Sequence, residues 1–196
     1  MNKFIALDIG NVCLKLRFER CFYALGCAGD ERHSDRILRL AERLGRGEIS
    51  ECEWIKCMHR ETREQFSDKE ILENWNLILG DEIPGMHELL GEMRELGYEI
   101  IFFSDTSSIH ISRIFDYLKL TDCVAGGIYS YKVGASKPER KMYEAFEIKY
   151  GRPFLYSDDR EENIEAGIRS GWFSHLFTSV DLLRKTFMER HVSSLI

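Results

Sequence analysis

An apolar segment near the N-terminus ends directly on a carboxylate, and this junction limits the possible folds more than any other feature. Four apolar residues at positions 4–7 precede Asp8, and Gly10 and Asn11 follow as turn residues. A short, unbroken apolar run bounded by turn residues is typical of a strand buried on both faces of a sheet. Open α/β sheets bind ligands at the carboxyl ends of their strands. Asp8 is therefore a candidate functional residue, and the alternative is that it only caps the turn.

The composition predicts a globular protein with a sizeable core. The chain has 196 residues, of which 44% are hydrophobic, enough for one domain with an insert or for two small domains. Its net charge of −6 argues against nucleic acid or an anionic membrane as a partner. Neither a signal peptide nor an apolar run of about 20 residues is evident. We expect a cytoplasmic monomer or weak homodimer, with six reduced cysteines that do not bind zinc.

The segment from residue 17 to residue 79 has a helical pattern throughout. Two capping boxes begin at Ser50 and Ser67, and each is flanked by the apolar residues of a hydrophobic staple. Further apolar residues recur at helical spacing over 37–44 and 71–79, and no strand signal interrupts them. We therefore predict an inserted helical cap domain at 16–79 and a core domain formed by 1–15 and 80–196.

Strands and helices alternate after residue 80. Pro84 is well placed as the first residue of a helix, and buried strands are predicted at 98–103, 154–156 and 172–177. Weaker strand signals lie at 123–125 and 128–129. This alternation predicts an α/β fold, with a parallel sheet of five or six strands and helices on both faces. The strand before Asp8 should lie centrally, between the strands that end at Ser104 and at Asp158.

Polar side chains collect at the predicted carboxyl edge of this sheet. Asp8, Ser104 and the pair Asp158-Asp159 each follow a strand, and Lys137 follows a loop that contains glycine. Three carboxylates in one cleft would repel one another, and a bound Mg²⁺, which prefers hard oxygen ligands, would remove that repulsion. Lys137 and Ser104 would supply a cation and a hydroxyl to the oxygens of a phosphate. The set predicts phosphoryl transfer to a carboxylate.

Four ordered motifs make the sequence similar to the haloacid dehalogenase (HAD) superfamily. They are ALDIGNV, FFSDT, ASKP and YSDDREENIEAG, and together they span nearly the whole chain. The helical insert after the first motif resembles the type 1 cap of that superfamily. Within it, DIGNV together with SDDxxxN is most similar to the glucose-1-phosphate phosphatase-like branch. The resemblance implies a Rossmannoid three-layer α/β/α core with an inserted helical-bundle cap.

The resemblance also implies roles for individual residues. Asp8 would be the nucleophile that becomes an aspartyl-phosphate, and Asn163 would brace the acidic loop. The implied phosphate-binding residues are Ser104, Lys137, Asn11 and Asp105, and Ser104 and Lys137 are also catalytic. The implied Mg²⁺ ligands are Asp8, Asp159, Asp158 and the backbone carbonyl of Gly10, with Asp159 ranked above Asp158.

Two positions depart from the usual pattern of the superfamily. Gly10 stands where most of its phosphatases carry a second Asp as general acid and base, and Asp105 stands where the branch often has Asn. A proton donor would then come from elsewhere, such as Glu48 of the insert or an ordered water. Arg46 and Glu48 are candidates for contact with the substrate.

Three functions follow from this sequence. The first is a Mg²⁺-dependent phosphoric monoester hydrolase acting on a small phosphorylated metabolite, such as a sugar phosphate. The second is a non-hydrolytic binding or regulatory protein on the same scaffold, for which Gly10 is the main support. The third is a metal-independent haloacid dehalogenase, which also uses an Asp nucleophile without a second Asp.

Overall fold

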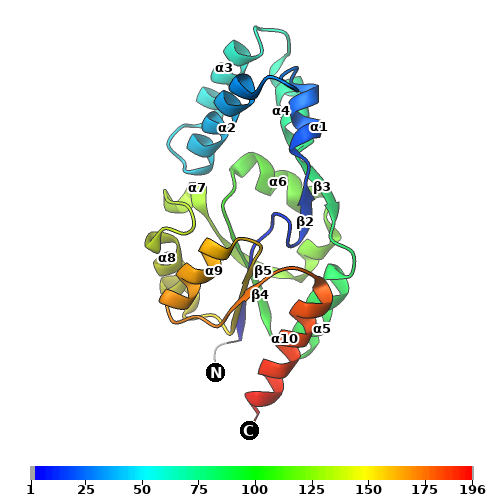
Figure 1. Ribbon diagram of the computed structural model, residues 1–196, viewed down its shortest axis with the longest axis vertical. Helices are drawn as coiled ribbons and strands as arrows, with labels where there is room; N and C mark the ends of the chain where they lie inside the picture. The colour runs from blue at the N-terminus through cyan, green and yellow to red at the C-terminus, as the bar shows by residue number, and fades with distance from the viewer. Residues whose placement is uncertain (1–2, 196) are drawn as a thin grey trace.

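The centre of the protein is a five-stranded parallel sheet (Figure 1). The computed structural model describes residues 3–195. The strands run in the order β5-β4-β1-β6-β7, and they are β1 (Phe4–Leu7), β4 (Glu99–Ser104), β5 (Val124–Tyr129), β6 (Leu155–Asp158) and β7 (Ser174–Leu176). All neighbouring strands pair in parallel. The prediction that β1 lies between the strands ending at Ser104 and at Asp158 is confirmed.

Helices cover both faces of this sheet and complete a three-layer α/β/α core. One face packs against α5 (Met86–Glu95), α6 (Ser108–Tyr117) and α10 (Val180–Ser193), and the other against α8 (Arg140–Tyr150) and α9 (Glu161–Arg169). Successive residues of β1 point to opposite faces, so Ile5 and Leu7 join one hydrophobic cluster and Ala6 joins the other. This two-sided burial explains the unbroken apolar run before Asp8.

Four helices form a separate unit above the carboxyl edge of the sheet (Figure 1). The helical unit consists of α1 (Phe18–Ala24), α2 (Glu31–Gly45), α3 (Glu51–Glu61) and α4 (Asp68–Asn76). Both predicted capping boxes form at its helix starts, on Ser50 and on Ser67. Its own hydrophobic cluster includes Trp54 and Trp75, whose ring centroids are 5.4 Å apart.

A two-stranded antiparallel ribbon joins this unit to the core, and the sequence did not predict it. The ribbon pairs β2 (Leu14–Leu16) with β3 (Leu79–Glu82). The helix expected over 71–79 ends at Asn76, so Leu79 lies in a strand. Strands of three and four residues are too short to show a reliable alternation of polar and apolar side chains. The helix expected to begin at Pro84 begins at Met86, with Gly85 as its N-cap.

The two weak strand signals after residue 122 belong to one continuous strand. Gly126 and Gly127 in the middle of β5 interrupt the sequence pattern of this strand, since glycine has a low strand propensity. A Cβ atom on Gly126 would lie 2.4 Å from the hydroxyl of Tyr150, so a larger residue there would have to displace the end of that side chain. The sequence also gave no signal for α10, for α7 (Ser130–Val133) or for the 3-10 helix Lys119–Cys123. Within residues 3–195, no helix combines the length and the hydrophobicity that a membrane span requires.

Candidate active site

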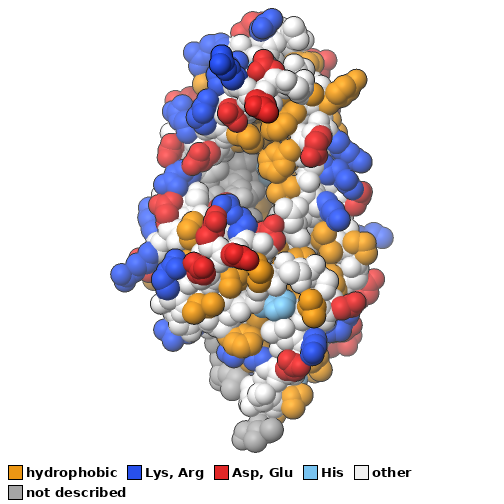
Figure 2. All heavy atoms as spheres, viewed as in Figure 1, with side chains coloured by type: hydrophobic (Ala, Val, Ile, Leu, Met, Phe, Trp, Pro, Cys, Tyr) orange, Lys and Arg blue, Asp and Glu red, His pale blue; other side chains and the backbone are white. Residues whose placement is uncertain are grey.

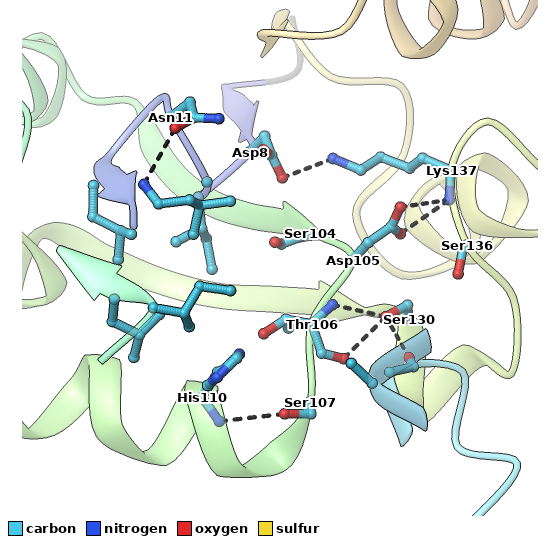
Figure 3. Close-up of a pocket in the computed structure, with 18 of the residues that line it drawn as sticks. Asp8, Asn11, Ser104, Asp105, Thr106, Ser107, His110, Ser130, Ser136 and Lys137 are labelled. Carbon is cyan, nitrogen blue, oxygen red and sulfur yellow. Dashed lines mark hydrogen bonds and ion pairs between the residues drawn. The ribbon is translucent and has the colours of Figure 1, made fainter. Parts of the chain in front are cut away.

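The carboxyl edge of the sheet and the helical unit enclose a cavity of about 490 Å³. Asp8, Ser104 and Asp158 come from the ends of β1, β4 and β6, and each of the three is buried. Lys137 reaches the same place from the loop between α7 and α8, as Figure 3 shows. The structure therefore brings together the residues that the sequence placed at one sheet edge.

Lys137 is a buried cation whose three N–H donors are all in use. Its Nζ atom lies 2.8 Å from Asp8 Oδ1 and 2.6 Å from Asp158 Oδ2, and it donates to the Phe103 carbonyl at 2.8 Å. Burial alone would lower the pKa of Lys137, but the carboxylates of Asp8 and Asp158 outweigh it and raise the pKa above its usual range. The lysine is therefore charged and fixed between the two acids.

Asp158 is saturated by hydrogen bonds. Its Oδ2 accepts from Lys137 and from the Tyr156 hydroxyl, and its Oδ1 accepts from the Arg160 backbone N–H and the Asn163 side chain. These four bonds fill the four lone-pair positions of a carboxylate. Burial would raise the pKa of Asp158, but the Lys137 charge and these hydrogen bonds lower it. Asp158 is therefore an ionised side chain that fixes Lys137 and orders the acidic loop, by which we mean the segment after β6 that carries Asp158 and Asp159.

Asp8 and Asp159 keep free acceptor positions. Only Oδ1 of Asp8 is bonded to Lys137, and burial together with the charge of Asp158 raises the pKa of Asp8 despite that lysine. Asp159 is half-buried and accepts one hydrogen bond, from Asn11 Nδ2 at 3.1 Å. Their arrangement leaves open oxygens on two carboxylates that face the cavity.

The three acids form a site that fits a divalent cation. One carboxylate oxygen from each of Asp8, Asp158 and Asp159 lies within 4.8 Å of the others. Hard oxygen donors suit Mg²⁺, and a single lysine leaves the three negative charges only partly neutralised. The free oxygens favour Asp8 and Asp159 as direct ligands, while Asp158 fixes Lys137 and the loop that carries Asp159.

The other predicted site residues also line the cavity. Ser104 points into it, and both oxygens of Asp105 accept the Lys137 backbone N–H at 2.9 and 3.1 Å (Figure 3). Asp105 therefore orders the lysine loop, and a contact between it and phosphate stays a prediction. Asn163 is buried and donates to Asp158, which is the bracing contact expected of it. Asn11 adopts a left-handed φ of 52° and connects Asp159 to the backbone N–H of Leu16.

We define the floor of the cavity as its polar lining at the carboxyl ends of β1, β4 and β6, together with Lys137. Gly10 lies where this floor meets the ribbon of β2 and β3. A Cβ atom at this position would be 2.9 Å from Leu16 Cδ1 and 3.4 Å from Leu16 Cγ. No backbone atom obstructs it more closely, so the side chain of Leu16 is what a larger residue at position 10 would have to displace.

The helical unit contributes different residues from those proposed at its loop. Neither Arg46 nor Glu48 lines the cavity; Arg46 pairs with Glu48 at 3.0 Å and with Glu139 of the core. The carboxylate that this unit does present is Glu42, on α2. The sequence pattern places Glu42 on the polar side of a helix and gives no further signal for it.

Other residues around the site also lacked a sequence signal. Tyr156 appeared only as the end of an apolar strand, yet its hydroxyl bonds Asp158. Ser130 accepts the Thr106 N–H at 2.8 Å and donates to the Gly45 carbonyl at 2.5 Å, which ties the loop after β4 to the end of α2 (Figure 3). His110 follows the motif FFSDT by four residues and lines the cavity from α6.

Comparison with solved structures shows that the chain has the fold of HAD-family enzymes. A HAD-family enzyme from Bacteroides thetaiotaomicron, solved as a complex with magnesium and inorganic phosphate, aligns with a TM-score of 0.79 at 23% identity over 92% of this chain and 96% of its own. A predicted HAD-like family hydrolase from Porphyromonas gingivalis aligns with a TM-score of 0.80 at 18% identity, over 95% and 98% of the two chains.

A more distant similarity is to an L-2-haloacid dehalogenase from Xanthobacter autotrophicus with chloropropionic acid covalently bound. Its TM-score is 0.61 at 12% identity, over 89% of this chain and 76% of the dehalogenase. The sequence matches no protein-family model and no curated protein. At these identities the likeness establishes the fold alone.

Proposed function

We propose that this protein is a Mg²⁺-dependent phosphoric monoester hydrolase that acts on a small organic phosphate through an aspartyl-phosphate on Asp8. The observation that carries the proposal is the buried arrangement of Asp8, Lys137 and Asp158 at the sheet edge, with Asp159 open beside them. The magnesium and phosphate bound to the similar Bacteroides enzyme support it. Magnesium would bind through Asp8, Asp159 and the Gly10 carbonyl, where it would neutralise charge on the carboxylates and on the phosphoryl oxygens.

The residues of the floor suit two successive displacements. The free oxygen of Asp8 attacks phosphorus, the ester P–O bond breaks, and the leaving alkoxide takes up a proton. Water then attacks the phosphoryl group on Asp8, which releases phosphate and restores the carboxylate. Lys137 holds Asp8 in place and contributes positive charge, while Ser104 offers a hydroxyl to the phosphoryl oxygens. A direct hydrogen bond from Lys137 to phosphate requires it to release one of its three present acceptors.

The absence of an acid at position 10 favours substrates with good leaving groups. Without a general acid the alkoxide leaves less easily, and such a group is typically worth about 10²–10⁴-fold in rate. Aryl and anomeric phosphates, whose leaving groups have a low pKa, should therefore react faster than simple alkyl phosphates.

The experiment is phosphate release from a series of monoesters, with and without Mg²⁺. We expect Mg²⁺-dependent turnover and a clear slope of log kcat/KM against leaving-group pKa. A flat slope, with chemistry shown to be rate-limiting, would mean that a proton donor is in place. No turnover of any ester would favour a binding or regulatory protein. Halide release from a 2-haloacid without metal would favour a dehalogenase, which the lack of an acid at Gly10 also permits.

A further inference from the structure

The cavity has a polar floor and a largely apolar upper wall. We define the upper wall as the cavity-lining residues of α1, α2, α4 and α6 and of the segment directly after α4. Its hydrophobic side chains include Phe18, Leu38, Ala41, Trp75, Ile78 and Ile114. Figure 2 shows the surface hollowed between the helical unit and the core, with hydrophobic side chains gathered beside the hollow below α1 and α4.

Two polar side chains and the unpaired indole N–H of Trp75 interrupt the upper wall, and none of them brings a positive charge to it. Glu42 is exposed at the rim. His110 stacks on Trp75, with ring centroids 5.2 Å apart and an interplanar angle of 16°, and its Nε2 atom is shielded from solvent without a hydrogen-bond partner. Burial lowers the pKa of His110 to about 4, although the Trp75 backbone carbonyl acts in the opposite direction, so the imidazole is neutral at pH 7.

A sugar would fit this wall poorly. Glu42, the His110 Nε2 atom and the Trp75 Nε1 atom are the hydrogen-bonding side-chain groups of the wall, and each further sugar hydroxyl that is buried without a partner costs roughly 1–3 kcal/mol. An apolar ring would instead exchange water for contact with aliphatic and aromatic side chains. A cavity of about 490 Å³ is large enough for a small ring together with a phosphoryl group.

We propose that the upper wall binds an apolar ring, so that the substrate is the phosphate monoester of a ring-bearing alcohol and not a sugar phosphate. This inference rests on the proposed phosphatase function, because it places the phosphoryl group at Asp8 and the alcohol against the helical unit. The wall then selects the substrate by its apolar surface, independently of how easily the alcohol leaves.

The test must separate this selection from the effect of leaving-group pKa. We would compare 2-phenylethyl phosphate with glycerol 1-phosphate and glucose 6-phosphate, all esters of primary alcohols. The hydroxyl groups of the two polar alcohols withdraw electrons, so chemistry alone favours those esters. We expect the phenylethyl ester to have a kcat/KM at least about tenfold higher than either. Equal or higher values for the polar esters would overturn the inference and leave the phosphatase proposal standing.

A pair of leucine variants locates the preference on the upper wall. Leu38 lines the cavity with 37% of its surface exposed, and Leu77, the residue directly after α4, has 42% exposed but does not line it. We expect Leu38→Ser to raise KM for the phenylethyl ester about five- to tenfold and to leave glycerol 1-phosphate nearly unchanged. Leu77→Ser should change neither. An equal loss for both esters in Leu38→Ser, or an equal effect of Leu77→Ser, would contradict the assignment.

Binding separates the inference from the proposed function. If no ester is hydrolysed, the phosphatase proposal fails. Calorimetry with Mg²⁺ and the same esters then tests whether the upper wall binds an apolar ring. Tighter binding of 2-phenylethyl phosphate, lost in Leu38→Ser but not in Leu77→Ser, would support the apolar-ring site. Binding of the three esters with equal affinity, or of none, would overturn it.

Discussion

The floor and the upper wall of the cavity are stabilised in different ways. On the floor, the buried pair Lys137 and Asp158 has every donor and acceptor engaged within the protein. The upper wall is formed mainly by apolar helix faces, whose side chains range from the buried Trp75 to Leu38 with 37% of its surface exposed. The helices that it takes from the helical unit are joined to the core by polar contacts at the edge of that unit, such as the pair of Arg46 with Glu139. Rigid positioning of charge suits a reaction common to many substrates, whereas an adaptable apolar surface suits selection among them. Changes on the floor should therefore affect all esters alike, and changes on the wall should depend on the alcohol.

The largest effect should come from Asp8→Asn. The amide cannot attack phosphorus, yet its oxygen can still accept the bond from Lys137, so we expect a loss of about 10⁴-fold or more in kcat for every ester with an unchanged thermal midpoint. Phosphate release and thermal unfolding measure the two quantities. Asp181→Asn is the matched control, since the side chain of Asp181 is 94% exposed on α10. Turnover by Asp8→Asn at close to the wild-type rate would show that Asp8 is not the nucleophile.

The two acids of the acidic loop should respond differently to amide substitution. Asp159→Asn loses a charged oxygen that is free for metal, so we expect about 10–100-fold weaker Mg²⁺ activation, restored at high Mg²⁺. In Asp158→Asn the amide nitrogen would face two donors in either orientation, so we expect roughly 3 kcal/mol lower stability and no rescue by Mg²⁺. Mg²⁺ titrations and denaturant unfolding distinguish them. Identical behaviour of the two variants would contradict the separate roles.

Gly10→Asp tests the boundary between floor and wall. The new side chain meets Leu16, so we expect little gain from the single substitution and a gain of about tenfold or more in alkyl-ester turnover for Gly10→Asp with Leu16→Ala. The comparison is kcat for one alkyl and one aryl phosphate across the two single variants and the double variant. Leu16→Ala alone serves as the control for enlarging the cavity. A gain of equal size for the aryl ester would argue against an added proton donor.

The smallest effect concerns the stability of the wall in acid. Burial depresses the folded-state pKa of His110 to about 4, so protonation favours the unfolded chain. The stabilisation is complete above the unfolded-state value of about 6.5 and is lost as the pH falls from there toward 4. His110→Phe keeps a ring against Trp75 and should remove roughly 1 kcal/mol of this pH dependence, less than the full shift because the residue keeps some exposure.

Urea unfolding at pH 7.5 and pH 5 measures this difference. Between pH 7.5 and pH 5 we expect the free energy of unfolding of the wild type to fall by roughly 1 kcal/mol more than that of His110→Phe. An equal fall for the two proteins would show that His110 does not titrate between these pH values. The rate at which His110→Phe hydrolyses glycerol 1-phosphate at pH 7.5 should be close to that of the wild type.

The floor could be predicted from the sequence because it depends on local patterns. Each of its acids follows a short apolar run, and parallel strands bring such positions to one edge. The two-sided core and both capping boxes follow from the same local rules. The hydrogen bonds that divide the roles of Asp158 and Asp159 depend on tertiary geometry, so the sequence supported only a ranking.

The wall and its connections could not be predicted in the same way. Helical periodicity shows that α2 is amphipathic, but not that Glu42 reaches the cavity while Glu48 pairs with an arginine. The short ribbon strands carry too little pattern to be recognised, and the glycines of β5 reflect the space needed by Tyr150 and Tyr129. These features depend on how separate elements meet, which single-sequence patterns do not encode.

The ribbon between core and helical unit also affects how the chain tolerates change. Leu16 and Leu79 are paired across β2 and β3, so the polypeptide leaves the core and returns to it at neighbouring positions. For the core, the whole intervening segment is then one closed loop whose ends are already held together. Doubling the length of such a loop adds only about 0.6 kcal/mol of closure entropy. The helical unit can therefore gain or lose residues with little penalty to the sheet, and a cavity wall of new shape can be placed over an unchanged floor.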